Sequence, residues 1–336
     1  MYESVSLIIL LINLPVLFFY NFITKKINLY DHNDGKRKFH ITPIPLIGGF
    51  LLIYNILIFI IFDYNIDFKE NIHKYFFNTR ESVAFFSGII FCFLLGVYDD
   101  KFNLSAYKKL IINFFIISFV ILLDEGLVIN QLSFTFLENP IDLRNLSYFF
   151  SVLCFLLFIN ALNMFDGINL QTGSYCILIL SIFIFKGLYI LLSFIIILTL
   201  IIFLFYNFKN KAFLGDGGTQ LLAFVISYIL IKSHNQEAAI RPEEIFIFLA
   251  FPGLDMLRLF ILRLSNGKNP FTPDTNHIHH LISRKYNKFK AYLLLLFVIA
   301  IHIILYYQID NKVIILLMTL FSYILMMSIF KSRINK

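Results

Sequence analysis

Long apolar segments dominate this chain and leave it few ways to fold in water. Of its 336 residues, 59% are hydrophobic and only 15% are charged, and the mean hydropathy is +0.79. A soluble domain has too little interior to bury so much apolar surface, so we expect the bilayer to act as the solvent. The three cysteines lie in or beside apolar segments, which argues against a disulfide framework.

A helix that crosses a membrane needs about 20 mostly apolar residues. Eleven segments approach this pattern: 5–22, 47–62, 83–98, 110–123, 146–163, 174–185, 188–205, 220–231, 245–262, 291–306 and 313–330. The apolar block 174–205 is broken only by Lys186-Gly187. One helix of that length would reach about 48 Å, too long for a core of ~30 Å, so two helices are predicted. The expected fold class is an all-α polytopic membrane protein with about eleven transmembrane helices.

Basic residues indicate the orientation of these spans. If the N-terminus lies outside, the inner loops hold more than twice as many Lys and Arg residues as the outer loops. Because cytoplasmic loops are enriched in Lys and Arg, the N-terminus is predicted outside and the C-terminus in the cytoplasm. We expect a single integral-membrane domain over 1–336. Its cytoplasmic loops are expected at 23–47, 99–109, 160–173, 206–219 and 263–290.

Four polar islands interrupt the apolar pattern, and this topology places all of them on the cytoplasmic side. They are Asp99-Asp100-Lys101, Asn160 to Gly167, Phe213 to Gly218 and His277 to His280. Ionisable groups beside membrane spans are costly and usually functional. Their position predicts one water-filled hollow at the inner leaflet, where a charged soluble substrate meets a lipid.

The first two islands suggest acid–base chemistry and a polar cavity. Asp99 and Asp100 repel each other, so a cation or a bound proton is expected there, and a general base beside a metal is one interpretation. A solvated helix end is the other. Asn160, Asn163 and Asp166 recur at steps of three, close to one helix face. They would line a polar cavity or join neighbouring helices.

The last two islands suggest phosphate chemistry. Glycines around Asp216 would let backbone N–H groups approach a phosphate, and Mg²⁺ between Asp216 and a pyrophosphate is the sensible arrangement. A flexible glycine turn is the alternative. His277, His279 and His280 could ligate zinc, but the neighbouring oxygen donors suit Mg²⁺ or Mn²⁺ better. We therefore interpret the histidines as phosphate donors or a substrate clamp.

The ninth predicted span carries ionisable residues of its own. Asp255 and Arg258 are spaced to pair, and an intramembrane pair is expected to face an aqueous cleft. Pro252-Gly253 predicts a helix break or kink.

Together the motifs resemble those of the polyprenyl-phosphate N-acetylhexosamine-1-phosphate transferases of glycosyltransferase family 4. The likeness is greatest to the branch that starts O-antigen, enterobacterial common antigen or teichoic acid linkage units on undecaprenyl phosphate. The stretches that carry it are Lys36 to His40 with Ile44 to Gly49, Leu95 to Asp100, Asn160 to Gly167, Phe213 to Gly218, and Asn269 to Asp274 with His277 to His280. One departure is Asn169, where the family often has Asp, so a base or metal role at this position is in doubt.

The resemblance implies a cytoplasm-facing enzyme of the bacterial plasma membrane that uses Mg²⁺ (or Mn²⁺). It would transfer N-acetylglucosamine-1-phosphate, or that of another N-acetylhexosamine, from a UDP-sugar to undecaprenyl phosphate and release UMP. A homodimer is left open, as is the choice between direct transfer and a phospho-enzyme. The implied catalytic residues are Asp99, Asp100 and Asp216, with Asp216 and Asp100 at the metal. The implied substrate-binding residues are His40, Asn160, Asn163, Asp166, Asn169, Phe213, Arg263, Lys268, His277, His279 and His280.

Three other functions remain as alternatives. Within the family, the runner-up is the transferase that loads phospho-N-acetylmuramoyl-pentapeptide onto the same lipid. A secondary transporter would place its key charges near mid-membrane and show repeat symmetry, and neither feature is visible in the sequence. A histidine-bound metal protein would carry tightly bound zinc or iron.

Overall fold

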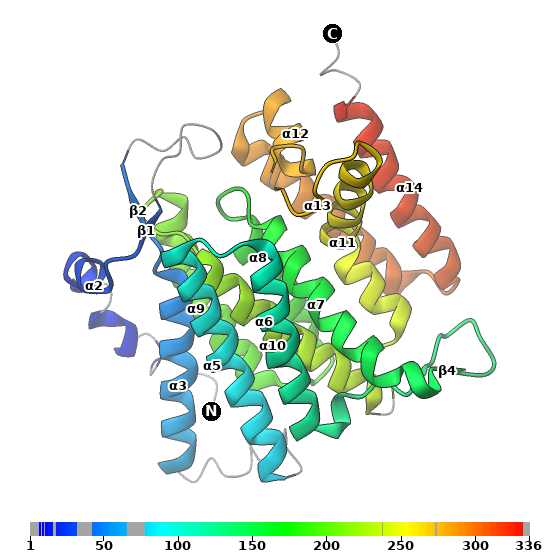
Figure 1. Cartoon of the computed structure of the whole chain (residues 1–336), viewed down its shortest axis with the longest axis horizontal. Coiled ribbons are helices and arrows are strands. Elements are labelled where there is room, and N and C mark those ends of the chain that lie inside the picture. The colour runs from blue at the N-terminus through cyan, green and yellow to red at the C-terminus, as the bar shows by residue number, and fades with distance from the viewer. Residues whose placement is uncertain are drawn as a thin grey trace. The chain divides into compact units, whose positions relative to one another are not determined.

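A computed structural model of the chain is mostly helical (Figure 1). The structure describes residues 18–31, 42–65, 78–236, 238–272 and 274–331, together with 7, 9 and 11–15. Two compact units form, and each is described by itself. Unit 1 comprises Met1–Asp124 with Gly173–Ile226, and unit 2 comprises Glu125–Thr172 with Ser227–Lys336. Whether the two act as a single domain stays a prediction.

Unit 1 contains two packed helix pairs, in which α5 lies along α6 and α3 lies along α9. Its elements are α2 (Tyr20–Ile27), the antiparallel strands β1 (Tyr30–Asp31) and β2 (Ile44–Pro45), α3 (Gly48–Asn65), α5 (Thr79–Phe102), α6 (Ala106–Leu123), α8 (Gln171–Phe185), α9 (Ile190–Phe208) and the first half of α10 (Gly215–Asn235).

A tight connection joins α5 to α6. Asn103 ends α5 in the left-handed conformation that Asn tolerates, and its N–H bonds to the carbonyl of Asp99 at 2.8 Å. The N–H of Leu104 then donates to Asp99 Oδ1 at 2.6 Å. Ser105 follows as the N-cap of α6. This turn places the start of α6 against the carboxylate of Asp99.

The segment around β2 lies against the start of α10 within unit 1. Phe213 N–H donates to the Pro45 carbonyl at 3.0 Å, and Gly48 N–H donates to the Phe213 carbonyl at 3.0 Å. Leu46 and Phe213 form a parallel bridge between these bonds. Two motifs that are far apart in the sequence are therefore joined by backbone hydrogen bonds.

Unit 2 is built around α11, which packs against α7, α13 and α14, with α12 packed on α13 and α14. Its elements are the 3-10 turns η1 (Glu125–Leu127) and η2 (Arg144–Leu146), the antiparallel strands β3 (Gln131–Leu132) and β4 (Ile141–Asp142), α7 (Ser147–Phe165), the end of α10, α11 (Pro242–Ser265), α12 (Ile278–Lys285), α13 (Lys288–Gln308) and α14 (Lys312–Lys331).

The apolar helices agree with the sequence prediction in its coarse form, a polytopic membrane protein. Among the described residues, 7 helices are long and apolar enough to cross a membrane, and Gly48–Ile58 and Gln171–Phe185 are shorter apolar helices. The count of eleven crossings and the orientation of the termini stay predictions.

Two local predictions of helix breaks have different outcomes. The break in the block 174–205 is confirmed, because α8 ends at Phe185 and α9 begins at Ile190, with Gly187 at φ +77 between them. The helix break predicted at Pro252-Gly253 is wrong, because α11 runs through both residues without interruption. Prolines are tolerated in membrane helices when neighbouring groups satisfy the freed carbonyl.

Candidate active site

Three carboxylates and one lysine converge in unit 1. We call Asp99, Asp100, Asp216 and Lys109 the carboxylate cluster. Lys109 Nζ lies 2.8 Å from Asp99 Oδ2 and also pairs with the carboxylate of Asp216. The side chains of Asp99 and Lys109 are each 11% exposed, whereas that of Asp216 is 32% exposed. Lys109 therefore ties the two carboxylates together, and Asp216 is the one open to a ligand.

Asp100 has a different set of contacts from its neighbour. Its Oδ1 accepts from the backbone N–H of Asp216 at 2.9 Å, and its Oδ2 accepts from the N–H of Gly217 at 3.2 Å. These are first-turn N–H groups of α10, which lack partners within the helix and favour a negative charge. Asp100 thus caps α10 and fixes Asp216. Both carboxylate oxygens of Asp100 already accept hydrogen bonds from these N–H groups. Its expected place at the metal stays a prediction.

Gly96 explains why α5 and the start of α10 approach so closely. A Cβ built on Gly96 would lie 2.3 Å from the Asp216 carbonyl oxygen and 2.4 Å from Gly217 N. These are backbone atoms, so a side chain here would push α10 away from α5. The absence of a side chain at Gly96 therefore allows α10 to hold Asp216 close to α5.

The donor set of the carboxylate cluster fits Mg²⁺ when a substrate completes the site. Hard carboxylate oxygens suit Mg²⁺, which proteins bind through one or two carboxylates together with substrate phosphates and water. Among the described residues, no group of three or more His, Cys, Asp or Glu side chains forms a metal cage. Asp216 would hold the ion, and phosphates would supply the remaining ligands. The use of Mg²⁺ or Mn²⁺ as the cofactor stays a prediction.

Lys109 was not among the residues singled out from the sequence. In the sequence, Lys108 and Lys109 indicate only the orientation of the spans. In the structure Lys108 is exposed and Lys109 is buried. Their order along the chain gives no sign of which one turns inward. The available signal was the excess of nearby acidic residues, which calls for a buried cation.

A second polar group lies in unit 2. We call Asp255, Arg258, His277, His279 and His280 the histidine cluster. Asp255 Oδ2 lies 2.8 Å from His277 Nδ1, and Arg258 Nη2 donates to Asp255 Oδ1 at 2.7 Å. The rings of His277 and His279 are stacked with centroids 5.5 Å apart, and those of His279 and His280 are 4.3 Å apart. The predicted Asp255–Arg258 pair is present, and it reaches the triple-histidine segment.

His279 connects this cluster to the third motif. A Cβ on Gly167 would lie only 1.9 Å from His279 Nε2, so the ring packs directly over the glycine. His279 is 1% exposed, and neither ring nitrogen has a hydrogen-bond partner within the described structure. Burial lowers the pKa of His279 well below its ordinary value, with His280 and His277 adding to the effect. Burial first, then His277 and Arg284, lower the pKa of His280 to about 4.

Arg263 organises the loop that precedes the histidines. Its Nε donates to Asp274 Oδ2 at 3.0 Å and its Nη1 to the Pro270 carbonyl at 2.7 Å. Burial raises the pKa of Asp274, but the N–H of Asn276 and the guanidinium of Arg263 outweigh it and hold that pKa below its usual value. Nη2 of Arg263 is buried without a partner within the described structure. Arg263, which was predicted to bind the substrate, therefore keeps one N–H donor for a ligand.

The other predicted residues are placed as follows. Asn160 and Asn163 lie on α7 and Asp166 directly after its end, but Asn160 Nδ2 donates to the Leu156 carbonyl of its own helix at 2.7 Å. Asn169 is half-buried, Lys268 is exposed, and Phe213 is fixed through its backbone. His40 lies outside the described residues. The structure joins the motifs of Pro45, Asp99 and Asp216 in unit 1, and those of Gly167 and His277 in unit 2. The single hollow for all of them stays a prediction.

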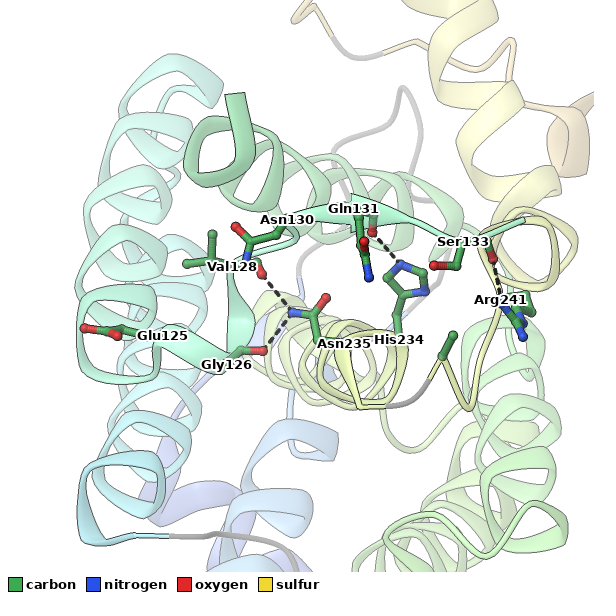
Figure 2. A pocket seen from close by; sticks show the side chains of 10 residues that line it. Glu125, Gly126, Val128, Asn130, Gln131, Ser133, His234, Asn235 and Arg241 are labelled. Carbon is green, nitrogen blue, oxygen red and sulfur yellow. Dashed lines mark hydrogen bonds between the residues drawn. The ribbon is translucent and has the colours of Figure 1, made fainter. Parts of the chain in front are cut away.

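Unit 2 also holds two cavities that the sequence did not reveal. A polar cavity of about 540 Å³ lies at the end of α10, where His234 points at Gln131 and Asn235 at Val128 and Gly126 (Figure 2). The two nitrogens of His234 each lie 3.0 Å from a backbone carbonyl oxygen, those of Ile240 and Gln131. A mainly apolar cavity of about 660 Å³ is lined by side chains of α7, α10, α11 and α14.

Comparison with known proteins places these observations in a family. Residues 82–234 match the model of glycosyl transferase family 4. A probable undecaprenyl-phosphate N-acetylglucosaminyl 1-phosphate transferase of Bacillus subtilis is 30% identical over 287 residues, 82% of this chain and 75% of that protein. The undecaprenyl-phosphate alpha-N-acetylglucosaminyl 1-phosphate transferase of Escherichia coli K12 is 29% identical over 280 residues, 80% and 72% of the two chains. That of Salmonella typhi is 27% identical over 276 residues, 77% and 70% of the two chains. The chain therefore belongs to glycosyl transferase family 4.

Proposed function

We propose that this chain transfers N-acetylglucosamine-1-phosphate from UDP-N-acetylglucosamine to undecaprenyl phosphate in the bacterial plasma membrane, with its active site facing the cytoplasm. The names of its relatives in Bacillus subtilis and Escherichia coli support the sugar phosphate and the lipid acceptor. They do not favour the transferase for phospho-N-acetylmuramoyl-pentapeptide. Membership of a transferase family also argues against a transporter.

The observation that carries the proposal is the carboxylate cluster. Lys109 pairs with Asp99 and Asp216, and Asp100 accepts only from backbone N–H groups, so one ammonium group stands against three carboxylates. A divalent cation would balance that charge and offset the repulsion between two phosphate-bearing substrates. Asp216, whose side chain is more exposed than that of Asp99, would hold the ion, and Lys109 would keep Asp99 and Asp216 in place.

The transfer itself needs positioning more than covalent help from the protein. An oxygen of the lipid phosphate attacks the β-phosphorus of the UDP-sugar, and the bond to the bridging oxygen breaks as UMP leaves. Asp99 would orient the acceptor phosphate or take its proton, and Asp100 would hold α10 in place. In unit 2, Arg263 Nη2 is a partnerless donor suited to a diphosphate or sugar, and the neutral His279 ring offers one donor and one acceptor nitrogen.

A turnover assay on membranes tests this function. Membranes with the expressed protein are incubated with UDP-N-acetylglucosamine, undecaprenyl phosphate and Mg²⁺, and UMP is measured. We expect UMP release that depends on all three additions and is absent from membranes carrying an Asp216→Asn variant. Turnover of the UDP-muramoyl-pentapeptide nucleotide in place of UDP-N-acetylglucosamine would instead support the runner-up transferase.

A further inference from the structure

Asp255 is a carboxylate, buried within the long apolar helix α11, that collects hydrogen-bond donors from several elements. It is 3% exposed. Besides Arg258 Nη2, its Oδ1 accepts from Tyr323 Oη on α14 at 3.2 Å and from the N–H of Ile278, the first residue of α12, at 3.2 Å. Its Oδ2 faces His277 Nδ1 at 2.8 Å. One side chain therefore ties α11 to α14 and to the start of the triple-histidine segment.

The contact with His277 fixes which ring nitrogen carries the hydrogen. An ionised carboxylate can only accept hydrogen bonds, and the donors around Asp255 favour the ionised form. His277 Nδ1 must therefore be the N–H donor. In the neutral ring, Nε2 then carries a lone pair, which repels a phosphate oxygen. Nε2 can instead accept a hydrogen bond from a hydroxyl or N–H group of a ligand.

Other charged and titratable groups lie around His277. Arg258 on α11 is paired with Asp255 and also donates to the Asn276 carbonyl at 2.7 Å. Tyr323 on α14 lies behind Asp255. Asp274 is on the preceding loop, and His279 and His280 are on α12. Asp255 is the group that bonds directly to the His277 ring.

We propose that Asp255 is the positioning residue of the triple-histidine segment, holding His277 as the Nδ1–H tautomer so that Nε2 accepts a hydrogen bond from a hydroxyl or N–H group of the nucleotide sugar. This inference rests on the proposed function for the identity of the ligand. The tautomer of His277 does not depend on it.

The Asp255→Asn variant separates positioning from packing. The amide matches the carboxylate in size, but its NH₂ group would face His277 Nδ1 and force that nitrogen to accept. The proton then moves to Nε2, so the ring can no longer accept a hydrogen bond there. KM for UDP-N-acetylglucosamine should rise by about tenfold in Asp255→Asn, whereas kcat should change little.

Tyr323→Phe is the matched control. It removes one donor from the same carboxylate, but it leaves the His277 contact and its tautomer unchanged. We expect this variant to keep the KM of the unmodified enzyme. A purely structural role of Asp255 would instead lower kcat and thermal stability in Asp255→Asn without changing KM, and that outcome overturns the proposal. An equal rise of KM in both variants overturns it as well.

Nitrogen NMR on histidine-labelled protein in detergent tests the tautomer without any turnover. His277, assigned through loss of its signal in His277→Gln, should show a protonated Nδ1 in the unmodified protein and a protonated Nε2 in Asp255→Asn. Observation of the Nε2–H tautomer in the unmodified protein excludes the proposal even if Asp255→Asn does not fold. Absence of UMP release together with the Nδ1–H tautomer would reject the proposed function and keep the positioning role.

Discussion

The carboxylate cluster of unit 1 and the histidine cluster of unit 2 differ in how completely their charges are balanced. In the first, Lys109 pairs with Asp99 and Asp216 while Asp100 is bound only by backbone N–H groups, so negative charge is in excess. In the second, Asp255 is paired with Arg258, and the nearby Asp274 with Arg263. Nη2 of Arg263 is a further N–H donor without a partner among the described residues. The first region suits a cation and the second suits an anion.

The largest expected effect comes from neutralising the exposed carboxylate. Asp216→Asn should reduce UMP release by about 10³-fold or more, because it removes the acidic side chain most open to a divalent ion. Asp310→Asn, at an exposed acidic residue elsewhere in the chain, is the control and should retain activity. Folded protein is verified by thermal unfolding in detergent. Near-normal UMP release from folded Asp216→Asn would discard the metal role.

Variants of Lys108 and Lys109, at the start of α6, test whether the carboxylate cluster carries an excess of negative charge. Lys109→Met should lower the maximal rate by about 10²-fold, because Asp99 and Asp216 lose their shared partner. The Mg²⁺ concentration for half-maximal rate should fall at the same time, since the cluster becomes more negative. The neighbouring exposed Lys108 gives the control variant Lys108→Met, for which both quantities should stay near normal. An unchanged Mg²⁺ requirement in Lys109→Met would contradict the comparison.

Two helical glycines, Gly96 in unit 1 and Gly253 in unit 2, form a matched pair that tests helix packing. Gly96→Ala should lower the thermal unfolding temperature and the activity together, because the new methyl group meets the backbone of Asp216 and Gly217. Gly253→Ala meets no atom within 4 Å, so it should stabilise α11 by about 0.5–1 kcal/mol. Equal stability of the two variants, measured by thermal unfolding in the same detergent, would count against this account of Gly96.

The smallest expected effect is on acid stability, and it concerns unit 2. The pKa of His280 is lowered to about 4 in the folded protein, whereas an unfolded histidine titrates near 6.5. Between these values the unfolded chain binds more protons, so the free energy of unfolding should fall as the pH drops from about 6.5 towards 4. His280→Gln should make this fall shallower. Chemical unfolding at several pH values measures it, and an identical slope in both proteins would refute the assignment.

Sequence patterns predicted the features that depend on local order. The length of the block 174–205 predicted two helices, and the motifs placed Asp99 and Asp216 at one site, which agrees with their shared contact to Lys109. Lys109 was missed because the choice between Lys108 and Lys109 depends on how α5 and α6 pack. The link from Asp255 to His277 was missed for a similar reason, since it requires α11 and the following loop to fold back on each other. The break predicted at Pro252 was wrong because a single proline can be accommodated inside a long helix.

Lys109 also bears on whether the side chains of the carboxylate cluster keep their arrangement in the purified protein. Since the ammonium group already holds Asp99 and Asp216 together, the arrangement of these side chains does not rely on an ion from the medium. We expect purification in a chelating buffer to yield an inactive but folded enzyme, which regains activity when divalent ions are added back. Supply of the ion would then act as a reversible on–off control that is separate from folding.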